Sequence, residues 1–268
     1  MQNFIRDKGA GVENDFFDLF SVVFAASESD RSRVFSLRHK VYCEELGYEP
    51  IDAKNRIERD EFDGRSLHCL IEHRATGLSA GCMRIVFPDN WDEGGYGLPI
   101  EEHCREHGVA IKLDSKVRSE DLCEISRVAI PSYFRSSRVE EAAVDGFGEF
   151  VFSQQERRFF PMIGVSLFLC ATAFTGLIGR FHVLAMMENR FQRLLARSGI
   201  RFSQVSQPIH FRGERAAFYI DQRHAEYGMR SSILPLYRSI QKDLSRQIME
   251  KGSVPGILGT GTLCKILN

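Results

Sequence analysis

Residues 159 to 179 carry no charged side chain, and no other feature of the sequence restricts the fold as strongly. A helix of twenty-one uncharged residues is long enough to cross a lipid bilayer. The run also contains one proline, three glycines and three hydroxyl side chains, and its most helix-prone part, residues 165 to 177, is too short for a span. We therefore predict a helix buried inside the domain and no transmembrane span, with contact to a membrane surface left open.

The composition is that of a folded protein without a strong overall charge. Hydrophobic residues make up 43% of the 268 positions, which is ample for a buried core. Thirty-five basic against 36 acidic residues leave a formal charge of -1, so no nucleic-acid partner is predicted. The seven cysteines stand singly, without a C-x-x-C pair, and the first residues contain no apolar core of signal-peptide length. Both observations favour a cytoplasmic protein.

The hydrophobic pattern predicts strands and helices in an order typical of an α/β domain. Strands are expected at 19–25, 67–74, 78–87, 121–130, 181–187, 202–205 and 216–220. Helices are expected at 27–46, 99–107, 136–152, 165–177, 188–198 and 233–249. This order predicts a mixed central sheet with helices on both faces. The chain is expected to divide into a mobile lead-in at 1–16, one domain at 17–225, and a C-terminal helix with a glycine-rich tail at 226–268.

Acidic side chains and arginines recur along the first half of the chain, each inside an otherwise apolar element. The acids precede the predicted strand at 67–74, and the arginines come from one predicted helix and two predicted strands. A buried arginine needs a carboxylate partner, because its desolvation otherwise costs several kcal/mol. We therefore predict a substrate-binding charge network that shapes an amine pocket, formed by Arg38, Tyr42, Tyr48, Glu58, Asp60, Asp63, Arg84, Ser126 and Arg127. The alternative is a solvated acidic turn whose arginines pair elsewhere.

The same residues carry a resemblance to a known family. Four segments, in the same order and at matching distances, resemble the signature of the acyl-homoserine-lactone synthases, a branch of the GNAT-like acyltransferases: Arg38-x-x-x-Tyr42, Glu58-x-Asp60-x-x-Asp63, Gly81-Cys82-x-Arg84 and Glu124-x-Ser126-Arg127. The segments 37–50 and 60–63 are similar in sequence to two further protein families. These are the acyltransferases associated with the PEP-CTERM/exosortase system and the long-chain N-acyl amino acid synthases. The resemblance covers residues 30 to 220.

The resemblance implies a GNAT-like fold with a β-bulge in its central strand. Glu124 and Arg127 are three residues apart, so a regular strand would point them to opposite faces. A bulge would re-aim one of them and free backbone N–H groups between Val128 and Ile130 for a thioester oxygen. Glu124 would then accept the proton of the attacking ammonium. The alternative is that Glu124 only pairs with an arginine.

The resemblance also implies a cleft for the acyl chain beside the central strands. The uncharged helix would supply an apolar wall for a long chain through Leu167, Phe168, Phe174 and Leu177. The same side chains would serve equally as plain core. The sequence does not decide which side of the helix each of them faces.

The chain departs from the family pattern in two places. Tyr42 stands where the lactone synthases have Phe, and Tyr48 falls near a Trp that helps to hold S-adenosylmethionine there, while the only tryptophan here is Trp91. The GNAT pyrophosphate loop lacks both of its glycines in the segment 135–140. An acyl group carried on acyl carrier protein is therefore expected over coenzyme A. Arg135 and Arg138, at a helix N-terminus, would bind the phosphopantetheine phosphate.

The sequence thus predicts an N-acyltransferase. It would move a long-chain fatty acyl group from an acyl carrier protein or coenzyme A thioester to the amine of a small molecule, such as an amino acid. Direct transfer needs no covalent enzyme intermediate and no bound cofactor, and the eight histidines show no metal-binding spacing. Two alternatives stay open: an acyl-homoserine-lactone synthase that uses S-adenosylmethionine, and an acyl-binding module without catalytic activity.

Overall fold

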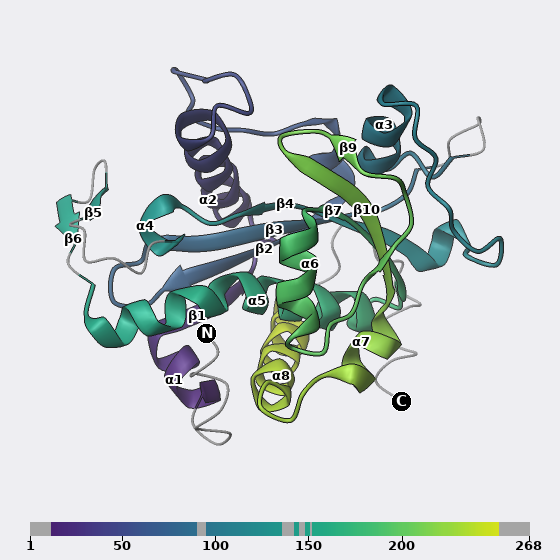
Figure 1. Ribbon diagram of the computed structural model, residues 1–268. Coiled ribbons are helices and arrows are strands. Elements are labelled where there is room, and N and C mark those ends of the chain that lie inside the picture. The colour runs from purple at the N-terminus through teal and green to yellow at the C-terminus, as the bar shows by residue number, and fades with distance from the viewer. Residues whose placement is uncertain (1–11, 90–94, 136–141, 145–147, 151, 252–268) are drawn as a thin grey trace.

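A mixed sheet runs through the centre of the molecule (Figure 1). The computed structural model describes residues 12–89, 95–135, 142–144, 148–150 and 152–251. The strands follow the order β1-β2-β3-β4-β7-β10-β8, with β9 paired to β10. Their bounds are β1 Phe20–Phe24, β2 Ser66–His73, β3 Ser79–Val86, β4 Leu122–Ala129, β7 His182–Met187, β8 Ser203–Gln204, β9 Ile209–His210 and β10 Glu214–Asp221. The hydrophobic pattern predicts all of them except β9.

Helices cover both faces of this sheet, as the sequence predicts. Figure 1 shows α2 and α3 on one face and α5 and α8 on the other. The helical segments are α1 Val12–Leu19, α2 Glu28–Arg38, η1 His39–Glu45, η2 Glu61–Arg65, α3 Pro99–Glu106, η3 Ser119–Asp121, α4 Ser132–Arg135, α5 Gln154–Leu177, α6 Asn189–Ala196, α7 Gln222–Gly228 and α8 Leu234–Lys251. The segment η1 continues α2 as a π-helix, so the two together fill the helix predicted at 27–46.

Along the path from β1 to β10, β4 and β7 form the one parallel pair. Neighbouring strands from β1 to β4 pair antiparallel, as do β7 and β10. The strands β4 and β7 pair parallel, because α5 carries the chain back between them. The α/β sheet of mixed direction is therefore confirmed.

The uncharged run forms most of α5, which lies across the sheet. The helix begins with a capping box, in which the hydroxyl of Ser153 accepts from the N–H of Glu156. At Gly81 of β3 a Cβ atom would lie 3.0 Å from the side chain of Ile163, so glycine lets helix and strand approach closely. Among the described helices α5 alone has the length and apolar composition of a membrane span, and 83% of that stretch is buried inside the protein. The predicted core helix is confirmed.

Two segments differ from the prediction. Residues from 12 onward form α1 rather than a mobile lead-in, because Phe16 is fully buried against Phe20. Over its described part, the helix predicted at 136–152 is replaced by two paired strands, β5 Ala142–Val144 and β6 Gly148–Phe150. Glycines at 146 and 148 disfavour a helix there. The glycine-rich tail after residue 251 lies outside the described residues.

Candidate active site

Three arginines and three acids alternate in a closed ring of ion pairs. Around the ring the contacts are Arg38–Glu58 at 2.5 Å, Glu58–Arg127 at 3.2 Å, Arg127–Asp60 at 2.9 Å, Asp60–Arg84, Arg84–Asp63 at 2.9 Å and Asp63–Arg38 at 2.6 Å. Arg38 and Arg84 are fully buried. Each charge meets two opposite charges, which offsets the desolvation of buried ions. The structure thus brings together all six charged residues assigned to the network from the sequence.

Hydrogen bonds between aspartate side chains and backbone N–H groups fix the conformation of the acidic loop. Asp60 accepts from the N–H of Phe62 and Asp63 accepts from the N–H of Asp60, which forms a capping box at the start of η2. Burial raises the pKa of Asp63, but the charges of Arg38 and Arg84 outweigh it and lower the pKa to about 2. The Asp63 carboxylate is therefore ionised at neutral pH.

A further acid and arginine extend the ring toward solvent. Glu49 accepts from Arg127 at 3.4 Å and from Arg212 at 2.6 Å. The guanidinium of Arg212 lies over the ring of Tyr48, 5.2 Å from its centroid, and Tyr48 stacks on Tyr42. Sequence reasoning missed Glu49 and Arg212. Each lies in a loop, where no hydrophobic period marks which side chains point inward.

The predicted bulge lies in β4 at Arg127. Opposite the step from Arg84 to Cys82 in β3, the facing segment of β4 contains one residue more. Arg127 takes a left-handed φ of 51°, a conformation that is costly for a residue with a Cβ atom and is held here by its ion pairs. The hydroxyl of Tyr42 donates to the carbonyl oxygen of Val128 at 2.8 Å. This bond ties the helical segment η1 to the bulge.

Glu124 stands apart from the ring. Its side chain is buried, and Oε2 accepts from the N–H of Ile100 at 2.9 Å, in the first turn of α3. Burial raises the pKa of Glu124 to about 8, although this hydrogen bond and the charges of Arg84 and Arg127 act in the opposite direction. No arginine or lysine within the described ranges forms an ion pair with it. A carboxyl group in this state is suited to exchange a proton near neutral pH.

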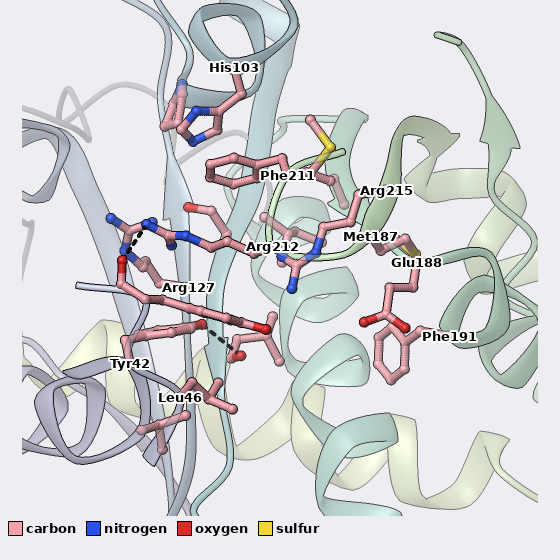
Figure 2. A pocket seen from close by; sticks show the side chains of 18 of the residues that line it. Tyr42, Leu46, His103, Arg127, Met187, Glu188, Phe191, Phe211, Arg212 and Arg215 are labelled. Carbon is pink, nitrogen blue, oxygen red and sulfur yellow. Dashed lines mark hydrogen bonds between the residues drawn. The ribbon is translucent and has the colours of Figure 1, made fainter. Parts of the chain in front are cut away.

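Glu124 lines a pocket of about 430 Å³ that opens where β4 and β7 part (Figure 2). Pairing between the two strands ends at Ile125 and Ala185. One set of lining residues, the polar side, contains Tyr42, Tyr48, His103, Glu124, Ser126, Arg127, Phe211, Arg212 and Arg215. A second set, the apolar side, packs with the core around α5 and contains Ile125, Val128, Ile130, Phe168, Ala185, Met187 and Phe191. One pocket is therefore lined by both polar and apolar side chains.

Of the four side chains predicted for an acyl pocket, Phe168 lines this one. Its ring meets that of Phe191 edge to face, with centroids 5.3 Å apart. Leu167 packs against β3 at Gly81, and Phe174 packs against Phe24 in the core. Leu177, nine residues after Phe168, is rotated about 180° from it around the helix. These three do not line the pocket and have the core role that the sequence left open.

Phe168→Ala and Phe174→Ala form a matched pair that tests the apolar side. We expect Phe168→Ala to deepen the pocket and move the preferred acyl donor toward longer chains. Phe174→Ala should lower the free energy of unfolding by about 3–5 kcal/mol and leave chain preference unchanged. The measurement is kcat/KM over a series of donors of increasing chain length. An unchanged profile for Phe168→Ala would place the acyl chain elsewhere.

The structure describes part of the predicted phosphate site. Arg135 lines the pocket, is the last described residue of α4 and pairs with Glu45. Glu45 also accepts from the N–H of Ser132 at 3.0 Å. Arg138 lies outside the described residues. The helix N-terminus predicted for the phosphate lies at residues 136–138, outside the described residues, so this site stays a prediction.

Comparison with known proteins identifies the domain and the fold. A family model described as an acetyltransferase (GNAT) domain matches residues 37–145. Three solved structures are similar: the AHL synthase LasI (17% identity, TM-score 0.52, 82% of this chain and 94% of LasI), the CoA-dependent acyl-homoserine lactone synthase BjaI with MTA (16%, 0.54, 83% and 89%), and TofI in a ternary complex with an inhibitor and MTA (18%, 0.52, 76% and 91%). No curated protein sequence matches the chain significantly.

The matched segment contains the ring and Glu124, whereas Arg212 and α5 lie beyond it. The similar structures each cover more than three quarters of this chain, so the shared fold extends beyond the matched segment. The GNAT-like fold inferred from the sequence is confirmed. Residues 37–145 therefore match the model of a GNAT acetyltransferase domain, and the chain has the fold of the acyl-homoserine-lactone synthases.

Proposed function

We propose that the protein is an N-acyltransferase that moves a fatty acyl group from a thioester donor to the amine of a small molecule. The observation that carries this proposal is Glu124, which is buried on the wall of a pocket with a polar and an apolar side and has no cation partner among the described residues. The amine occupies the polar side, next to Glu124. The acyl chain occupies the apolar side, beside Phe168 and Phe191.

The proposed reaction is a direct transfer within a ternary complex. Glu124 takes a proton from the ammonium, directly or through water, and the free amine attacks the thioester carbonyl. Backbone N–H groups between Val128 and Ile130, at the bulge, stabilise the oxyanion that forms. The C–N bond forms, the C–S bond breaks, and the thiolate leaves with a proton. Holding both substrates in one pocket lowers the entropic part of the barrier.

We propose acyl carrier protein as the preferred acyl carrier. The segment 135–140 lacks the glycines that let a GNAT loop wrap around the pyrophosphate of coenzyme A. The fold does not decide the question, because the similar structure BjaI is described as CoA-dependent. We expect kcat/KM to be at least about tenfold higher with an acyl carrier protein thioester than with the same acyl group on coenzyme A, a difference of about 1.4 kcal/mol. Equal use of both donors contradicts the proposal.

A second candidate, a lactone synthase that uses S-adenosylmethionine, is favoured by the aromatic lining of the polar side. Tyr42 stacks on Tyr48, and His103 stacks on Phe211 with ring centroids 4.1 Å apart. Flat aromatic surfaces of this kind suit the adenine of an adenosyl group. The products separate the two candidates, because this reaction yields a lactone and methylthioadenosine instead of an open-chain N-acyl amine.

The test is organic extraction of cells that express the protein, followed by mass spectrometry for new N-acylated amines. We expect such products with the natural sequence and none with Glu124→Gln. The absence of any product in several hosts would favour an acyl-binding module without catalysis. The link to the PEP-CTERM/exosortase system and the cytoplasmic location stay predictions from the sequence.

A further inference from the structure

Two arginines of the β9–β10 region line the polar side, and their surroundings differ. Arg212 is neutralised by Glu49 at 2.6 Å. Arg215, in β10, is partly buried, and its Nε atom has no hydrogen-bond partner. Within the described part of the chain no carboxylate forms an ion pair with its guanidinium. Arg215 therefore brings an uncompensated positive charge into the pocket.

Arg215 lines the same pocket as Glu124. In the pairing of β10 with β7, Ala216 lies opposite Met187, so Arg215 falls opposite Glu188. Side chains alternate along a strand, which puts Arg215 on the same face as Ala217, in the cluster that also contains Ile100. Ile100 is the residue whose N–H holds Glu124. Figure 2 shows the guanidinium of Arg215 directed into the pocket, between Arg212 and Glu188.

Arg127 and Glu188, which also line the pocket, already have partners of opposite charge. Arg127 pairs with Glu49, Glu58 and Asp60, and Glu188 pairs with Arg190 at 2.8 Å. A partly buried cation without a counter-charge loses hydration that no protein group replaces. A bound anion would replace the lost hydration of the guanidinium with charge-assisted hydrogen bonds.

We propose that Arg215 binds a carboxylate of the acceptor, so that the enzyme selects amines that also carry a carboxylate. This assignment rests on the proposed function. It names the substrate class for the polar side: the amine faces Glu124 and the carboxylate faces Arg215. The second source of an anion is the phosphate of the donor's pantetheine arm, and the experiment separates the two.

Arg215→Gln tests the assignment, with Arg193→Gln as the matched control. Arg193 is an exposed arginine of α6, so its replacement removes the same charge away from the pocket. The purified proteins are assayed with the common amino acids and S-adenosylmethionine, and with the carboxamide of each amino acid. Because Arg215 has no ion pair within the described residues, Arg215→Gln should keep the thermal midpoint of the natural protein.

We expect Arg215→Gln to raise KM for carboxylate-bearing acceptors by about 10- to 100-fold, the loss typical of a hydrogen bond between charged groups. The KM values for the carboxamides and for the acyl donor should stay within about threefold, and Arg193→Gln should change none of them. An equal rise for acids and carboxamides overturns the assignment. A rise confined to the donor also overturns it and points to the pantetheine phosphate.

Thermal-shift titration with the same acceptors separates this assignment from the proposed reaction. One outcome is that carboxylate-bearing amines stabilise the natural protein but not Arg215→Gln, while no acyl donor is turned over. This result would support carboxylate binding by Arg215 and contradict the transferase reaction. If the natural protein is stabilised by none of the carboxylate-bearing amines and turns none over, the assignment fails.

Discussion

Glu124→Gln is expected to lower kcat/KM by about 100- to 10,000-fold and to leave the fold intact. The amide oxygen of Gln can still accept from the N–H of Ile100, so the contact between β4 and α3 persists. The amide cannot take a proton from the ammonium at neutral pH. Steady-state kinetics and circular dichroism check the two parts of this prediction. An active Gln variant removes Glu124 from the role of base.

The pH dependence of the natural protein tests the same residue independently. Burial raises the pKa of Glu124 from 4.5 to about 8, so turnover should rise with pH as the carboxyl group loses its proton, with a midpoint near 8. The free energy of unfolding should fall over the same pH range. The folded state keeps a proton that the unfolded state releases above pH 4.5, so this group destabilises the fold progressively as pH rises toward about 8.

Glu124→Gln removes that titration. The variant should therefore gain stability relative to the natural protein between pH 5 and pH 9, by up to a few kcal/mol. Urea unfolding at both pH values measures the difference. The same stability difference at pH 5 and pH 9 contradicts a raised pKa for Glu124.

Arg84→Leu is expected to lower the free energy of unfolding by about 3–5 kcal/mol. The change leaves Asp60 and Asp63 each with one of their two cation partners, and it removes the donor to Ser126. The matched control is Arg118→Leu, because Arg118 pairs with two acids at the surface, where its side chain is 66% exposed. The control should cost less than about 1 kcal/mol. Equal losses in the two variants would show that the ring contributes no more than a surface pair.

The stability effect of Arg84→Leu should also depend on pH. The pKa of Asp63 lies at about 2 in the folded protein against an ordinary value of 3.8. Its stabilising contribution is therefore complete above about pH 4 and is lost as pH falls toward 2. The stability difference between the natural protein and Arg84→Leu should narrow over that interval. A constant difference down to pH 2 contradicts the pairing of Asp63 with the arginines.

The sequence predicts the pairing of these acids and arginines because a buried charge without a partner is strongly destabilising. Arg84 lies in an apolar strand, and a buried guanidinium must meet a carboxylate. The acids that precede β2 stand together within residues 58–63, which makes them the candidate partners. The bulge at Arg127 was implied by the resemblance, since composition alone carries no signal for one extra residue in a strand.

The rest of the site depends on information that the local sequence does not contain. The helix α5 is apolar on all sides, so no polar face indicates that Phe168, rather than Phe174, meets the pocket. Arg215 and Arg212 reach the polar side only through the pairing of β10 with β7, more than 80 residues after the bulge. Long-range strand pairing of this kind has no short-range pattern.

The most direct test of the proposed N-acyltransferase activity is a stoichiometric measurement on the purified protein. Acyl carrier protein loaded with a labelled fatty acid is mixed with carboxylate-bearing amines, and free thiol and N-acyl product are quantified together. An N-acyltransferase should form one N-acyl amine for each thiol released, and Glu124→Gln should lose both products. Thiol release without amide, or no reaction with any donor and amine, would contradict an N-acyltransferase.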